Sequence, residues 1–159
     1  YFRMFREGVV EYREPPFHLL PKLSDPDFLK KQPPYYWLAS ASYENQLPRT
    51  IEKGRIGRFR MDTLSTGTTT TLRLRVHTKE VIGKRNITAA MNGKPLELTP
   101  DVSAFCDNPF DTMITPNEKH RRAWKVPGKI ISNGLNALEF NLTSGEPLTI
   151  IWIDAGADI

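Results

Sequence analysis

Apolar and polar residues alternate regularly along several stretches of this chain. In residues 72–77, LRLRVH, apolar side chains alternate with two arginines and a histidine. In residues 137–143, ALEFNLT, the apolar positions are Leu138, Phe140 and Leu142. Side chains of a β-strand point to opposite faces in turn, so this period of two predicts half-buried strands. We expect Leu138, Phe140 and Leu142 to face a core and the alternating polar residues to face outward.

Turn signals separate these strands. Asn92-Gly93 predicts a two-residue hairpin, because both central residues of a type I′ turn need positive φ. Further turns are predicted at SNGLN, residues 132–136, and SGEP, residues 144–147. The final strand, LTIIWID at residues 148–154, is apolar on both faces. We therefore expect it to lie at the centre of a sheet.

Two more stretches have the character of strands, YYWLASA from residue 35 and GRIGRFRM from residue 54. In all, seven to eight short strands are predicted, with turn signals every 8–15 residues and almost no amphipathic helix. This pattern predicts an all-β chain, an antiparallel β-sandwich of Greek-key or jelly-roll type. The 159 residues are about one domain, long enough for a core without staples. Thirteen prolines also favour strands and loops over helices.

Residues 1–34 are irregular by comparison. They contain a short predicted strand at Gly8–Tyr12 and a short predicted helix, LSDPDFLKK, with Ser24 as its N-cap. The segment is too short and too broken by proline to form its own core. We expect residues 1–34 to be a linker or docking segment, or the end of an upstream barrel domain. Residues 35–159 are expected to form the β-sandwich domain.

Residues 99–120 form a long predicted loop with three prolines and little periodicity. Loops of this length are usually functional. Asp101, Asp107 and Asp111 lie in it, and oxygen ligands on a loop suit calcium. No EF-hand pattern is present, so the preferred interpretation is that these residues cap loop backbone, with calcium as the alternative. The three histidines are too far apart in sequence to predict a zinc site.

The net charge of +4 comes from scattered basic clusters, among them Arg58 with Arg60, Arg73 with Arg75, and residues 119–122. We interpret these clusters as solvated outer faces of strands. A nucleic-acid groove needs a continuous basic stripe with stacking aromatics, which the sequence does not show. It also shows no apolar run long enough to span a bilayer. A single cysteine excludes an internal disulfide.

No catalytic fingerprint is present: the sequence lacks a nucleophile elbow, a P-loop and a dinucleotide-binding motif. Cys106 with His120 is a weak nucleophile pair, since free cysteines are mostly structural. The carboxylate pairs near the termini, Glu11 with Glu14 and Asp154 with Asp158, are better explained as solvated. Glu11 is the weak catalytic candidate, because a carboxylate at the end of a barrel strand is where barrel enzymes place such groups.

Sugars present apolar C–H faces that stack on aromatic rings, so exposed aromatics indicate carbohydrate binding. Phe110, on the long loop, and Tyr36, beside two prolines, are the better candidates for such contacts. Trp124 has no preferred face, and Trp152 within TIIWID is expected in the core. Two N-glycosylation triplets begin at residues 86 and 141, and such triplets are common by chance.

The segment AWKVPGKIISNGLNALEFNLTSG, residues 123–145, followed by PLTIIWIDAG, resembles the closing strands of galactose-binding-domain-like jelly rolls. The recurring pattern is an aromatic strand, Val-Pro, an apolar pair, Gly-x-Asn and an alternating strand. The Gly-x-Asn turn at Gly134–Asn136 would reverse the chain so that the next strand buries its apolar residues. LRLRV and NITAAMNGKPLEL look like the matching upstream part, so that the resemblance covers roughly residues 50–154. Residues 8–31 are similar to the segment that joins a barrel domain to such a module.

Modules of this class occur on many multidomain glycoside hydrolases. The resemblance therefore implies an extracellular or periplasmic accessory domain that binds carbohydrate or serves as a scaffold for a glycosidase domain. Binding residues vary within the class, so none can be transferred by motif. From the residues themselves we expect a site on the long loop, formed by Asp107, Phe110, Asp111 and Trp124. Two alternatives remain: a glycoside hydrolase fragment that contributes Glu11 to an active site, or a structural domain docked through its first residues.

Overall fold

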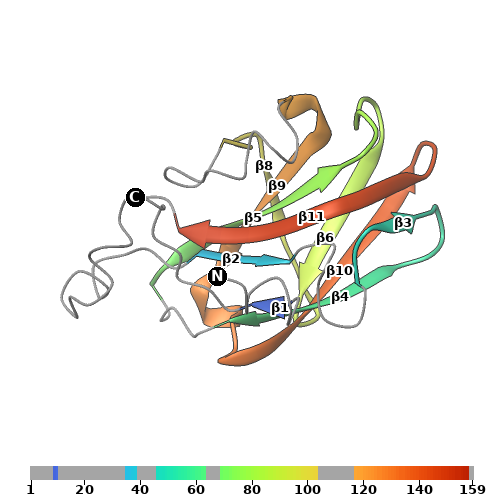
Figure 1. The fold of residues 1–159 in the computed structure, drawn as a ribbon. Helices are drawn as coiled ribbons and strands as arrows, with labels where there is room; N and C mark the ends of the chain where they lie inside the picture. Colours follow the sequence, from blue (N-terminus) through green and yellow to red (C-terminus); the bar gives the residue numbers. More distant parts are fainter. Residues whose placement is uncertain (1–8, 11–34, 39–45, 64–68, 104–116, 158–159) are drawn as a thin grey trace, which may run out of the picture.

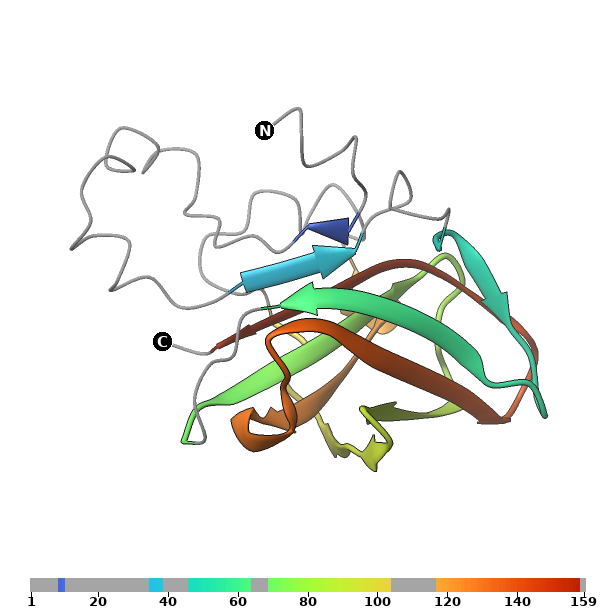
Figure 2. The same cartoon turned by 90° about the horizontal axis from the view of Figure 1, so that it is seen from below.

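The computed structural model describes residues 9–10, 35–38, 46–63, 69–103 and 117–157. Within these ranges, eleven strands form two antiparallel sheets, accompanied by two single-turn 3-10 helices. The sheets face each other, as Figures 1 and 2 show from two directions. The predicted all-β class and the antiparallel β-sandwich are therefore confirmed. The described residues include no helix of the length and apolar character that crossing a membrane requires.

The larger sheet, sheet A, has seven strands in the order β1-β2-β11-β5-β9-β8, and β3 also pairs with β11. Their bounds are β1 Val9–Val10, β2 Tyr35–Leu38, β3 Arg49–Ile51, β5 Thr71–Thr78, β8 Glu97–Thr99, β9 Arg121–Pro127 and β11 Leu148–Ala157. The curved strand β11 has β2 and β3 on one side and β5 on the other (Figure 1). The expected central place of this last strand is confirmed.

The smaller sheet, sheet B, has four strands in the order β4-β10-β6-β7. Their bounds are β4 Gly57–Thr63, β6 Asn86–Met91, β7 Lys94–Pro95 and β10 Gly134–Ser144, and the 3-10 turns are η3 Glu118–His120 and η4 Gly128–Ile130. Strands β6 and β7 form the predicted hairpin on Asn92 and Gly93, whose φ angles are +51° and +75°. Positive φ at both residues is what a type I′ turn requires.

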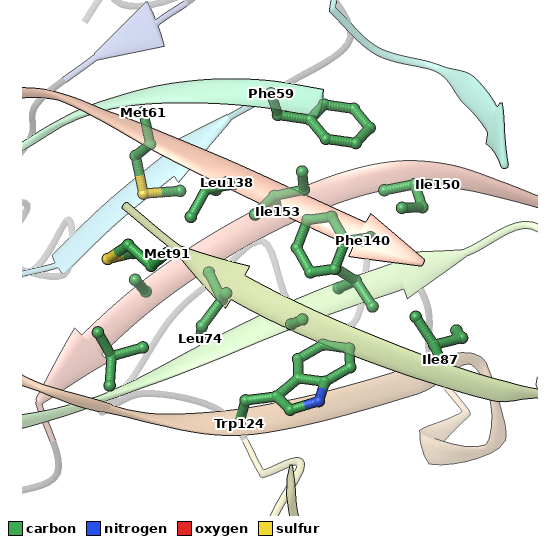
Figure 3. Packing of buried hydrophobic residues seen from close by; sticks show 14 of the residues in the cluster. Phe59, Met61, Leu74, Ile87, Met91, Trp124, Leu138, Phe140, Ile150 and Ile153 are labelled. Atoms are coloured by element: carbon green, nitrogen blue, oxygen red, sulfur yellow. The ribbon is translucent and has the colours of Figure 1, made fainter. Parts of the chain in front are cut away.

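The hydrophobic core lies between the two sheets (Figure 3). Leu138, Phe140 and Leu142 all face it, which confirms the register predicted for β10. Phe140 is at the centre of an aromatic group, with its ring centroid 5.7 Å from that of Phe59 and 5.5 Å from that of Trp124. Aromatic contacts at this distance stabilise a core beyond simple burial of area.

A β-bulge in β11 changes which residues face the core. Across from β5, Ile150 pairs with Thr78, but the next pair is Trp152 with His77, so one residue of β11 is extra. Because of this insertion Ile150, Ile153 and Ala155 belong to the core cluster. Trp152 and Asp154 lie instead at register positions on the outer face of sheet A. Bulges re-aim side chains in this way at the cost of one unpaired residue.

The buried amide of Asn136 joins three parts of the sandwich. Its Nδ2 donates to Thr63 Oγ1 at 2.7 Å and to the Ser132 carbonyl at 2.9 Å. Its Oδ1 accepts from the Ser132 backbone amide at 2.8 Å and from Asn92 Nδ2 at 2.7 Å. The side chain is fully buried. The Gly-x-Asn residues predicted to form a turn lie in β10 itself, where Asn136 pairs with Met61 of β4. The amide of Asn136 therefore connects the end of β4, the residues before β10 and the β6–β7 hairpin.

The edge of sheet B at β4 is covered by side-chain hydrogen bonds. The Gln46 amide accepts from the Arg60 backbone amide at 2.6 Å and donates to the Arg60 carbonyl at 3.1 Å. One residue pair further along, the Arg49 guanidinium donates to the Arg58 carbonyl and lies over the Phe59 ring, 4.8 Å from its centroid. Within the described ranges β4 pairs with β10 on one side only, and these contacts satisfy backbone groups on its other side.

Candidate functional site

A buried ion pair lies on the outer face of sheet A, away from the hydrophobic core. Arg75 on β5 and Asp154 on β11 are direct cross-strand partners. Their side chains form two parallel hydrogen bonds, Nε to Oδ1 at 3.0 Å and Nη2 to Oδ2 at 2.7 Å. Both are 0% exposed. Trp152 Nε1 also donates to Asp154 Oδ2 at 3.2 Å, and His77 Nε2 lies 4.0 Å from the same oxygen.

Arg75 and its neighbour on the same face of β5, Arg73, bind the first residues of the long loop. Arg75 Nη1 donates to the carbonyls of Val102 at 3.2 Å and Ser103 at 2.8 Å. Arg73 Nη1 donates to Ser103 Oγ at 2.9 Å and to the Asp101 carbonyl at 3.2 Å, and it pairs with the Asp101 carboxylate. Residues 101–103 therefore lie against the outer face of β5 and are fixed there by charged hydrogen bonds.

This arrangement corrects two interpretations made from the sequence: Asp154 is buried instead of solvated, and the outer face of β5 is not solvated either. Arg73, Arg75 and His77 do point away from the core, as their alternation predicts, but they are not solvated. The chain covers them, and the ion pair with Asp154 makes that burial tolerable, because a buried charge must be paired and hydrogen-bonded. Arg121, part of the cluster at residues 119–122, is likewise buried at 7% exposed.

The other end of the long loop is attached to the end of β5. Thr78 Oγ1 donates to the His120 carbonyl at 3.0 Å, and His120 Nδ1 lies 3.1 Å from the Thr78 carbonyl. The Ile82 backbone amide donates to the Lys119 carbonyl at 2.9 Å. The turn η3 is therefore held against the β5–β6 connection, and Figure 1 shows the two side by side at one end of the sandwich.

Between these two anchored segments lies a depression of about 450 Å³, which we call the loop-end depression. It is lined by residues of three segments: Val81, Ile82 and Gly83 of the β5–β6 connection, Pro100 and Val102 after β8, and Glu118, Lys119, Arg121 and Arg122 of η3 and β9. Apolar side chains thus form one part of its wall and mostly basic side chains the other. A concave, partly apolar site with a few placed polar groups is the usual form of a ligand site.

The fold lowers the pKa of Asp101, which lies beside this depression between Pro100 and Val102. Its Oδ1 accepts from the Ser103 hydroxyl and from the Ser103 backbone amide at 3.0 Å. These two hydrogen bonds are the main reason that its pKa is lowered from the ordinary value of 3.8, and the Arg73 guanidinium adds to the effect against slight desolvation. Asp101 therefore stays ionised to lower pH in the folded chain than in the unfolded chain.

The Asp101→Asn variant is expected to be less stable than the unchanged chain above pH 3.8. The folded-state pKa of Asp101 lies below 3.8. The difference in free energy of unfolding between the two proteins is therefore fully present above pH 3.8 and shrinks as the pH falls through the folded-state pKa. Urea unfolding of both proteins at a series of pH values between about 6 and 2 measures it. A stability difference that stays constant over this pH range would contradict a lowered pKa of Asp101 in the folded chain.

The carboxylate of Asp101 thus accepts hydrogen bonds from Ser103 and pairs with Arg73. Asp107 and Asp111, the other two calcium candidates, lie outside the described residues. Among the residues that the structure describes, no group of three or more His, Cys, Asp or Glu side chains is placed to hold a metal ion.

The aromatic candidates for carbohydrate binding have different outcomes. Trp124 is 1% exposed and packs on Phe140 in the core, which overturns its assignment as a sugar-stacking residue. Its cross-strand partner is the core residue Leu74, so its face is fixed by register. Tyr36 lies in β2, where its backbone pairs with Ala155. Phe110 lies outside the described residues, as does the catalytic candidate Glu11.

The two facing antiparallel sheets define a β-sandwich domain. No protein-family model matches the sequence, and the search of curated proteins gives no match. Among solved structures, the fold resembles part of a β-porphyranase of glycoside hydrolase family 86 from the human gut bacterium Bacteroides plebeius, with a TM-score of 0.50 and 11% sequence identity. The similarity covers 79% of this chain and 21% of that enzyme's chain. At this level of identity the likeness concerns the fold alone.

Proposed function

We propose that this chain is a non-catalytic accessory domain of a carbohydrate-active protein, of the galactose-binding-like jelly-roll class, and that it binds carbohydrate in the loop-end depression. The depression is the observation that carries the proposal. It lies where the long predicted loop leaves and rejoins the sandwich, and its volume is within the roughly 300–1,000 Å³ range of small-ligand sites.

Three further observations support this function. The fold is similar to a segment of a glycoside hydrolase that makes up 21% of that enzyme's chain. The exposed Val81 and the neighbouring Pro100 offer apolar surface of the kind that contacts the C–H face of a sugar ring. Both loop segments around the depression are fixed by hydrogen bonds to β5 and its connection, so little order has to be created when a ligand binds.

Affinity-gel electrophoresis of the chain against a panel of neutral and charged polysaccharides tests the proposal. We expect saturable binding to at least one of them, weakened roughly three- to tenfold by Val81→Ser, which removes part of a buried apolar contact. Leu135→Ser is the matched control, because Leu135 is also an exposed apolar residue but does not line the depression.

If the folded chain binds none of the polysaccharides, the carbohydrate-binding function is wrong. A role as a scaffold for a glycosidase domain then remains. Equal weakening by Val81→Ser and Leu135→Ser would mean that the binding surface lies elsewhere.

A further inference from the structure

We infer that the carbohydrate bound in the loop-end depression is anionic, with sulfate or carboxylate groups held by Lys119 and Arg122. This inference rests on the proposed function and specifies its ligand class. Three of the four charged residues in the described lining are basic, and Glu118 is the single acidic one. A wall of this composition attracts an anion and disfavours a cation.

The basic groups are placed by the fold. Arg121 begins β9, lines the depression and is 7% exposed, so it adds positive charge to the wall, and we assign it no direct contact with the ligand. Arg122 Nη2 donates to the Arg85 carbonyl at 3.4 Å, which orients this side chain. Lys119 is exposed, but its backbone is held by the amide of Ile82. Arginines that are already oriented bind planar or tetrahedral anions with less entropy loss than free side chains.

The apolar part of the lining favours a sugar over other polyanions. Val81, Pro100 and Val102 form a surface for a ring's C–H face, and the basic residues lie on the other segments of the same depression. Nucleic acids instead need a long basic groove with aromatic side chains on which bases stack. No aromatic residue occurs in the described lining, and three cations are few for a groove.

Matched pairs of polymers test the inference. Dextran sulfate is compared with dextran, and polygalacturonate with its methyl-esterified form, so that each pair differs chiefly in charge. We expect the chain to prefer the charged member of at least one pair, and added salt to weaken that binding. The two pairs also distinguish sulfate from carboxylate as the recognised group.

Lys119→Met should lower the affinity for the preferred anionic polymer roughly five- to tenfold, the effect of one charge-assisted contact. Lys129→Met removes the same charge from an exposed residue in η4, beyond the opposite end of β9, and should leave the affinity unchanged. A second variant, Arg122→Met, should act in the same direction as Lys119→Met. Thermal unfolding of each variant confirms that the chain is folded.

The outcomes separate this inference from the proposed function. Binding to the neutral polymers alone, or to both members of a pair with no effect of Lys119→Met, keeps the carbohydrate function and overturns the anionic ligand. Binding to none of the polymers overturns both. Equally tight binding to duplex DNA at the same salt concentration would identify a general polyanion surface and overturn the assignment to a sugar.

Discussion

Replacing Asp154 by alanine is expected to lower the free energy of unfolding by about 3–5 kcal/mol. The change leaves the Arg75 guanidinium buried without its bidentate carboxylate partner. It also removes the acceptor of the Trp152 indole N–H. Denaturation in urea, followed by circular dichroism, gives the loss from the shift of the midpoint.

Glu139→Ala is the matched control. Glu139 forms an ion pair of similar length with Arg58, 3.1 Å, but both side chains are substantially exposed. Exposed pairs contribute about 0–1 kcal/mol, so this change should have a small effect. The double replacement Arg75→Met with Asp154→Leu should recover part of the stability, because it removes both charges together but also removes the partners of the Trp152 N–H and of two loop carbonyls. Equal losses for Asp154→Ala and Glu139→Ala would contradict the importance of burial.

Replacing Asn136 by alanine should cost roughly 2–4 kcal/mol, since several buried groups lose their partner at once. Its amide donates to Thr63 Oγ1 and accepts from Asn92 Nδ2 and the Ser132 amide. Asn136→Asp keeps the acceptor and loses the amide donors, so it should also destabilise the fold. Urea denaturation measures both variants.

Asn141→Ala provides the control for this prediction. Asn141 lies on the same strand, β10, but is only partly buried, and replacements at such positions usually change stability by about 0.5 kcal/mol or less. If Asn136→Ala lowered the free energy of unfolding no more than Asn141→Ala, the hydrogen bonds of the Asn136 amide to β4 and to the β6–β7 hairpin would not be important for stability.

The sequence predicted the strands whose two faces differ in polarity. Strand β10 is an example: its alternation placed Leu138, Phe140 and Leu142 in the core, and the structure agrees. The same holds for the hairpin at Asn92-Gly93, because its positive φ angles require those residue types. The structure describes eleven strands instead of seven to eight, since strands of two or three residues such as β7 and β8 are too short to show a period.

The buried cluster on sheet A could not be predicted from the same pattern. Its alternation is correct for Arg75, but sequence alone does not say that a loop covers that face. The bulge in β11 adds a second obstacle, because a strict period of two from Ile150 would turn Asp154 toward the core. Trp124 was ambiguous for a related reason: its face depends on the register of β9 with β5, which is a tertiary property.

The side-chain caps on β4 have a consequence for how copies of this domain meet one another. Sheets grow by recruiting a foreign strand at an open edge, and that route leads to domain swapping and aggregates. A strand arriving at β4 would have to compete with the Gln46 amide for the backbone of Arg60 and with Arg49 for the carbonyl of Arg58. These contacts therefore make this stretch of β4 a poor site for pairing with a strand of a second copy.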